Sequence, residues 1–239
     1  MKHFHSLLLV TSFILSQLAV VAFAQDSSPQ LAGAQPLIEA TAYPSLQAAI
    51  DALPAIGGIV HIPAGEFSLT EPLRIPGENV HLTGAGPATV LKNTNTAGQP
   101  TIAVLPPGQI DRQATGKNQV TRWRVQISNL RLIGNEKSGS GIDALWVNEI
   151  FLHGLTITAH GGNGILLDNC YEDPRIADCL ITYNKQTGVN LLGCHDIVVS
   201  ANQFEENLDA LHCIDSFNLC MTGNNLDDHL GDGVVIENT

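Results

Sequence analysis

The sequence predicts an all-β solenoid, because its second half repeats one short pattern at a fixed spacing. From Val125 to Thr239 the chain divides into five segments of about 22 to 25 residues each. A period of this length holds about three short strands of roughly 5 residues, joined by turns. A leucine-rich repeat has a similar period, but the sequence lacks its Leu spacing and its helical segment. We therefore expect about seven stacked coils of strands over the whole domain.

Four columns of residues define the repeat. The first apolar column contains Leu132, Ile157, Ile181, Phe204 and Leu226, and the second contains Ile142, Ile165, Val189, Leu211 and Val234. Small residues precede the second column, at Gly141, Gly164, Gly188, Ala210 and Gly233. A polar column contains Asn135, His160, Asn184, Asn207 and His229. Self-similarity of this kind indicates coils that each contact only their neighbours.

The first 24 residues are expected to be a secretory signal peptide. Lys2 gives a basic start, an apolar core runs from Leu7 to Val21, and Ala22-Phe23-Ala24 forms an A-x-A cleavage site. Polar residues interrupt the apolar run, so it is shorter than a membrane span requires. The mature protein is therefore predicted to start after Ala24 and to be secreted or periplasmic, without a membrane partner.

Residues 25–40 are expected to be a polar linker and residues 41–239 the solenoid domain. A short amphipathic helix is predicted from Tyr43 to Leu53, with Ser45 as its N-cap, and it is placed to cover the first coil. Strands are predicted at Ile59–Ile62, Glu66–Leu69, Leu73–Ile75, Val80–Thr83 and Thr89–Leu91. From Pro106 to Trp123 the apolar pattern is lost, which predicts either a loop leaving the stack or a disordered insertion.

Three motifs in the N-terminal part carry a resemblance to a known family. They are Ser45-Leu46-Gln47-Ala48-Ala49-Ile50-Asp51, Gly57-Gly58-Ile59-Val60-His61-Ile62-Pro63-Ala64-Gly65-Glu66-Phe67 and Val80-His81-Leu82-Thr83-Gly84-Ala85-Gly86. From about Tyr43 onward the chain resembles the pectate lyase superfamily, which implies a right-handed parallel β-helix. That superfamily includes lyases, glycosidases, epimerases, phage tailspikes and proteins of no known activity. The resemblance therefore implies the fold more specifically than the reaction.

Charge and cysteine content narrow the classes of partner. The formal net charge is −12, which argues against binding to nucleic acid or to an anionic membrane surface. The chain has five Cys, all in the repeat region. Cys170 and Cys194 share a column, where a disulfide is geometrically conceivable. Cys179 and Cys213 align with inward-facing Leu residues, and we expect them to be small buried hydrophobes.

The strand that follows the Gly column provides the first candidate site. Its side chains alternate inward and outward, which predicts two outward stacks. One is Asp143, Leu166, Asn190, His212 and Val235; the other is Leu145, Asp168, Leu192, Ile214 and Glu237. Asp143, Asp168 and His212 are candidate acid and base groups, with Asn190 and Glu237 as candidate substrate-binding residues. The alternative is that these are solvated residues on an exposed strand.

A second candidate cluster lies at the last coil, where Asp228, His229 and Asp232 follow one another closely, and Asn163 and Asp209 occupy the column of Asp232. Uronate epimerases of this fold use an Asp-Pro-His motif, from which the sequence departs after Asp228. Polygalacturonases begin a strand with Gly-Asp-Asp, whereas this sequence has Gly231-Asp232-Gly233 and so departs at the second Asp. The structural alternative is that such residues satisfy turn backbones.

The distribution of charge favours hydrolysis of a polysaccharide over lyase or epimerase chemistry. No Lys or Arg follows Lys185, whereas nine Asp or Glu do. Elimination from a uronate requires a base and neutralisation of the substrate carboxylate. No cofactor is identified with certainty, and the acidic cluster leaves Ca²⁺ open as a ligand. A non-catalytic β-helix that binds polysaccharide or forms a surface structure is the alternative function.

The end of the chain carries one further expectation. The sequence stops at Thr239, directly after a strand-like segment. Since solenoids need terminal caps, we expect either that the C-terminal coils or cap are missing or that an end-to-end contact covers this edge.

Overall fold

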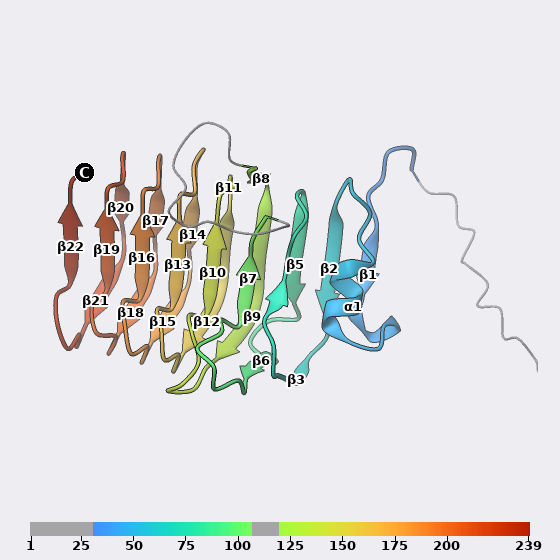
Figure 1. Ribbon diagram of the computed structural model, residues 1–239, viewed down its shortest axis with the longest axis horizontal. Helices are drawn as coiled ribbons and strands as arrows, with labels where there is room; N and C mark the ends of the chain where they lie inside the picture. Colours follow the sequence, from blue (N-terminus) through green and yellow to red (C-terminus); the bar gives the residue numbers. More distant parts are fainter. Residues whose placement is uncertain (1–30, 107–119) are drawn as a thin grey trace, which may run out of the picture. The chain divides into compact units, whose positions relative to one another are not determined.

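The chain forms a solenoid of parallel strands, shown in Figure 1 as ribbons stacked side by side from β2 to β22. The computed structural model describes residues 31–106 and 120–239. Residues Gln35–Thr239 form one compact unit. The expected signal peptide and its cleavage site lie outside the described residues, as does most of the expected loop. Within the described part of the chain, no helix has the length and apolar character that crossing a membrane requires.

One side of the solenoid is a parallel sheet that contains seven strands in the described residues. Its strands are β4 (Leu73–Arg74), β7 (Ile102–Val104), β10 (Ile142–Leu145), β13 (Ile165–Asp168), β16 (Val189–Leu192), β19 (Leu211–Ile214) and β22 (Val234–Glu237). They follow one another in chain order, one strand per coil. Ile142 pairs with Ile165, and Ile165 with Val189, so the predicted second apolar column is confirmed residue by residue.

The remaining sides belong to a sheet of 13 described strands. One row contains β1 (Leu37–Glu39), β2 (Gly58–Ile62), β5 (Val80–Gly84), β9 (Val125–Ile133), β12 (Phe151–Thr158), β14 (Arg175–Ala177), β17 (Val198–Ser200) and β20 (Cys220–Thr222). The other adds β3 (Gly65–Leu69), β6 (Thr89–Asn93), β15 (Leu180–Thr182), β18 (Gln203–Glu205) and β21 (Asn225–Asp227). Strands β9 and β12 run through both rows. Ile157 pairs with Leu132 and Ile181, which confirms the first apolar column.

The N-terminal end of the solenoid is covered by a short helix. Helix α1 (Leu46–Asp51) begins after Ser45, whose side chain accepts a hydrogen bond from the Ala48 amide at 3.1 Å, so the predicted cap is confirmed. Its Ala49 and Ile50 are buried in the core. The 3₁₀ helix η1 (Ala40–Ala42) precedes it. Burial of the apolar side of α1 shields the first coil from water.

Two boundaries differ from the sequence prediction. Leu37–Glu39, expected to be linker, forms strand β1, because its pairing with β2 satisfies an otherwise open sheet edge and buries Ile38. Arg122–Trp123, expected to be loop, forms strand β8, which pairs with β11 (Val147–Asn148). Both segments are too short for a periodic pattern to reveal them.

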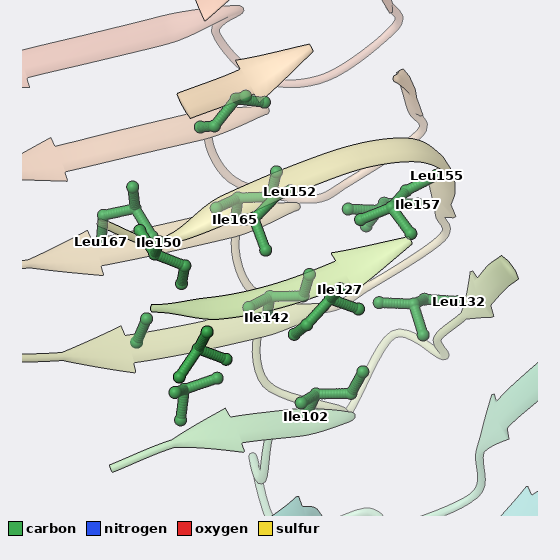
Figure 2. Packing of buried hydrophobic residues seen from close by; sticks show 14 of the residues in the cluster. Ile102, Ile127, Leu132, Ile142, Ile150, Leu152, Leu155, Ile157, Ile165 and Leu167 are labelled. Atoms are coloured by element: carbon green, nitrogen blue, oxygen red, sulfur yellow. The ribbon is translucent and has the colours of Figure 1, made fainter. Parts of the chain in front are cut away.

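Aliphatic side chains from both sheets fill the interior. Figure 2 shows Ile102, Ile142 and Ile165 of the seven-stranded sheet pointing toward Ile127 and Leu152 of the other sheet. All five are fully buried. Each coil thus adds one layer to a continuous core. Cys179 and Cys213 belong to that core, as predicted. All five cysteines are free thiols, and burial raises the pKa of Cys179 to about 12, which keeps it protonated.

A polar ladder runs through the interior beside the core. The Asn184 amide donates to Asn207 Oδ1 at 3.1 Å, and the His160 amide donates to Asn184 Oδ1 at 3.1 Å. The Asn207 amide donates to His229 Nδ1 at 3.3 Å, and Thr101 Oγ1 lies 2.9 Å from His160 Nε2. The side chains of Asn184, Asn207 and His229 therefore each satisfy a backbone amide of the preceding coil, and His160 contacts the Thr101 hydroxyl. The predicted polar column is confirmed for these residues as a structural element.

Removal of one ladder residue is expected to destabilise the protein strongly. Asn207 Oδ1 accepts from the Asn184 side chain at 2.9 Å, and Asn207 Nδ2 donates to the Ile181 carbonyl at 2.8 Å. Asn207→Ala leaves buried groups unsatisfied and should lower the free energy of unfolding by about 2 to 4 kcal/mol. The control Asn225→Ala removes an exposed hydrogen bond to Gln203 and should change it by less than about 0.5 kcal/mol. Equal losses in urea denaturation would contradict the ladder's role.

The ladder also predicts sensitivity to acid. Burial lowers the pKa of His160 from 6.5 to about 4, so between these pH values the unfolded chain binds a proton that the folded chain does not. Stability that is present above pH 6.5 is therefore lost as the pH falls toward 4. The loss attributable to His160 should be about 2 kcal/mol at about pH 5 relative to about pH 8. In His160→Asn, denaturation at the two pH values should show a smaller loss; an unchanged pH dependence would refute this assignment.

Candidate functional site

The outer face of the seven-stranded sheet collects most of the candidate residues. Strand register places Asp143, Leu166, Asn190, His212 and Val235 in one row across β10, β13, β16, β19 and β22. The same pairing places Leu145, Asp168, Leu192, Ile214 and Glu237 in a second row. These are the two stacks that the sequence predicts. Since parallel strands lie about 4.8 Å apart, each row extends for roughly 20 Å.

The second row is less exposed than the alternation of strand residues predicts. Leu145 is fully buried and Asp168 is 8 % exposed, whereas Glu237 is exposed. Asp168 Oδ1 accepts a hydrogen bond from Asn169 Nδ2 at 2.7 Å. In the first row, Asp143, Asn190 and His212 are all half-buried. The first row therefore offers a more continuous exposed surface than the second.

Two diagonal pairs of ionisable residues lie on this face. Asp143 and Asp168 occupy adjacent strands and are offset by two residues, which places their Cα atoms about 8 Å apart. His212 and Glu237 repeat the same diagonal on β19 and β22. Asp143 and His212 are three strands apart, or about 14 Å. Each diagonal has a separation suited to acid and base groups, but the two pairs are too far apart to act on one bond.

His212 has a carboxylate partner in Asp209, a residue that the sequence places in the turn column of the second cluster without connecting it to His212. Asp209 Oδ2 lies 3.0 Å from His212 Nε2, and the side chains are 13 % and 23 % exposed, respectively. Asp209 precedes β19, and its Oδ1 also accepts a hydrogen bond from the backbone amide of Asp232. The sequence places Asp209 in a turn column but gives no sign of this contact, because a spacing of three residues in a strand does not normally bring side chains together.

The acidic cluster of the last coil is divided between the polar ladder and the exposed surface. His229 Nδ1 faces the Asn207 amide and belongs to the polar ladder, while its buried Nε2 has no partner. Asp228 and Asp232 are exposed, and in the described part of the chain no hydrogen bond or ion pair joins either side chain to His229. Among the described residues no three His, Cys, Asp or Glu are arranged to hold a metal ion. The structure thus gives His229 a structural contact and leaves the roles of Asp228 and Asp232 as predictions.

The outer face of the larger sheet carries a polar network that the sequence did not single out. His81 Nε2 lies 2.8 Å from Ser128 Oγ, and His153 Nε2 lies 2.7 Å from Gln126 Nε2. Burial, then the charge of His153, lowers the pKa of His81, so its imidazole is neutral at neutral pH. Ser128 and His81 resemble a nucleophile and its base. However, Ser128 is fully buried, so a substrate cannot reach it.

A cavity of about 820 Å³ lies beside α1, lined mainly by apolar groups that include Leu46, Phe67 and Leu69. Two of its polar residues already have partners: Gln47 hydrogen-bonds to the Arg74 backbone, and Glu66 pairs with Lys92 at 3.2 Å. The outer face of the seven-stranded sheet, with its paired acid and base groups, is therefore the better candidate for chemistry.

Comparison with known proteins agrees with this architecture. A family model described as "Right handed beta helix region" matches residues 115–239, more than half of the chain, so the chain belongs to this family. The predicted right-handed parallel β-helix is thus confirmed. No curated protein sequence matches the chain.

Two solved structures share the fold. ORF18 of Geobacillus virus E2 is 18% identical with a TM-score of 0.63, and the match covers 84% of this chain and 47% of that one. The A-module of mannuronan C-5 epimerase AlgE6 from Azotobacter vinelandii is also 18% identical, with a TM-score of 0.60, covering 83% and 66%. The chain thus spans about half and about two thirds of their lengths. At this identity the likeness establishes the fold alone.

Proposed function

We propose that this protein binds an uncharged polysaccharide along the outer face of the seven-stranded sheet and hydrolyses it by acid–base chemistry. The observation that carries the proposal is the diagonal placement of Asp143 and Asp168 on adjacent strands. Hydrolysis of a glycosidic bond requires one carboxyl group as acid and another as base or nucleophile, separated by roughly 5 to 10 Å. The separation of about 8 Å between their Cα atoms is compatible with this requirement.

The shape of the face favours a polymer as ligand. The first row presents half-buried polar side chains on β10, β16 and β19, with Leu166 between Asp143 and Asn190. Polar groups beside apolar ones suit a sugar, which has hydroxyl groups at its edge and C–H groups on its faces. A row that crosses five strands can contact several sugar units of one chain.

The charge of the face favours an uncharged ligand. Strands β7, β10, β13, β16, β19 and β22 contain no Lys or Arg, whereas Asp143, Asp168 and Glu237 are acidic. A polyuronate would bring further negative charge to this surface, and like charges repel. Elimination or epimerisation of a uronate also needs neutralisation of the substrate carboxylate, for which these strands offer no cation. Hydrolysis of a neutral glycan therefore fits better.

The structural relatives support the general class of ligand by analogy only. The AlgE6 module is by its description a mannuronan C-5 epimerase, so the same fold serves carbohydrate chemistry in that protein. Export, predicted from residues 1–24, is part of our proposal, because a secreted or periplasmic protein can meet extracellular polysaccharides.

A non-catalytic binding protein is the second candidate function. The burial of Asp168 and its 2.7 Å hydrogen bond from Asn169 favour it, because a carboxylate used in this way can hold a turn instead of reacting. In this case the first row alone contacts the polysaccharide.

Substitution of the carboxylates separates the two functions. With a neutral glycan that the wild type cleaves, Asp143→Asn and Asp168→Asn should each lower the release of reducing ends by roughly 100-fold or more, because a proton donor or acceptor is lost. Affinity for the uncleaved glycan should change far less. Asp196→Asn is the control, since Asp196 is exposed on a turn away from the face and bonds to Asn218.

Two outcomes would reject hydrolysis, and a third would reject the catalytic role of the two carboxylates. Absence of new reducing ends over a panel of neutral glycans, with binding retained, would leave the non-catalytic function. Ultraviolet absorbance from an unsaturated product would show elimination instead. An equal loss of activity in all three variants would show that the carboxylates act only through stability.

A further inference from the structure

We infer that Asp209 is a positioning residue that fixes the imidazole of His212 as a hydrogen-bond acceptor for a sugar hydroxyl. The site would form one end of the glycan-binding face, at β19. The identity of the ligand as a glycan rests on the proposed function, whereas the positioning of His212 by Asp209 rests on contacts within the structure.

The contact between the two side chains determines which nitrogen of His212 carries a proton. An ionised carboxylate only accepts hydrogen bonds, so His212 Nε2, 3.0 Å from Asp209 Oδ2, must be the donor. A neutral imidazole with its proton on Nε2 leaves a lone pair on Nδ1. Within the described part of the chain, no group hydrogen-bonds to Nδ1. The free lone pair can accept a hydrogen bond from a hydroxyl group.

Asp209 is itself held by both neighbouring coils, through its side chain on one side and its backbone on the other. Its Oδ1 accepts from the backbone amide of Asp232, and its carbonyl accepts from the Gly188 amide at 2.8 Å. Gly231 leaves the space that this carboxylate occupies, because a Cβ at Gly231 would overlap Asp209 Oδ1. The backbone of Gly231 is not left-handed, so it is the missing side chain that matters here. A carboxylate held by the next coil, on a backbone held by the preceding coil, can keep an imidazole in one orientation.

The position of His212 assigns it to binding instead of bond cleavage. His212 lies three strands from Asp143, about 14 Å away, and therefore cannot transfer a proton at a bond held between Asp143 and Asp168. It adjoins Asn190 on β16 in the same row. A glycan that follows the row from Asp143 would reach His212 with a different sugar unit. Loss of the acceptor should thus weaken binding without slowing the chemical step.

Asp209→Asn tests the inference through two independent measurements. Nitrogen NMR of the histidines at mildly alkaline pH should show His212 with its proton on Nε2 in the wild type. In the variant the side-chain amide can donate to Nε2, so the single tautomer should be lost. In the same variant KM for the glycan should rise roughly 10-fold, as expected for one lost hydrogen bond, while kcat stays within about twofold.

Three variants serve as controls. Asp215→Asn removes an exposed carboxylate in the same coil, which contacts Asn238, and should change neither measurement. Gly231→Ala should reproduce the effects of Asp209→Asn by displacing the carboxylate. Gly233→Ala adds the same methyl group two residues later, where the nearest atom, Leu226 Cδ2, is at 3.8 Å, and should be silent.

Each result decides the inference. A wild-type His212 with its proton on Nδ1, or with mixed tautomers, would overturn the positioning role of Asp209. A changed tautomer with an unchanged KM, or a fall in kcat alone, would overturn the acceptor role. If the wild type binds and cleaves no glycan, the acceptor role falls with the proposed function, and the NMR comparison still decides the positioning role.

Discussion

In-register stacking of parallel coils is the constraint on which the rest of this structure depends. Each coil satisfies its backbone through its neighbours, so a residue at one position of the repeat lies directly beside its equivalents. The Asn and His ladder enforces this register at the turns, because Asn184, Asn207 and His229 each accept a hydrogen bond from a backbone amide of the preceding coil. A slip of one residue would bury the outward row and break every ladder contact.

The same constraint produces the candidate site. Stacking converts a period in the sequence into rows of side chains on a flat surface, and so brings Asp143, Asn190 and His212 together from three coils. Within a row, side chains are separated by multiples of the distance between strands. Asp143 and His212 therefore lie three strand spacings apart although they share a row. In our proposal, this face has a reacting pair at β10 and β13 and a separate hydroxyl-binding group at β19. Under the same proposal, the acidic character of the face favours ligands without negative charge.

The sequence predicted the parts of the structure that follow from periodicity. Both apolar columns, the Ser45 cap and the pairing of Asp143 with Leu166 depend only on the repeat and on local capping, and all are present. The burial of Leu145 and Asp168 was not predictable from the sequence. The alternation of side chains along a strand predicts which ones point outward, but it does not predict whether other residues cover them. The contact of Asp209 with His212 was also beyond the sequence, since it depends on a turn and on the missing side chain of Gly231.

The central claim is that a glycan follows the first row of the seven-stranded sheet. The most direct test is a crystal structure of the Asp143→Asn variant with a bound neutral oligosaccharide from the cleaved polymer. The account predicts a sugar chain across β10, β13, β16 and β19, with a sugar hydroxyl within hydrogen-bond distance of His212 Nδ1. An oligosaccharide bound on the outer face of the larger sheet, or in the cavity beside α1, would contradict it.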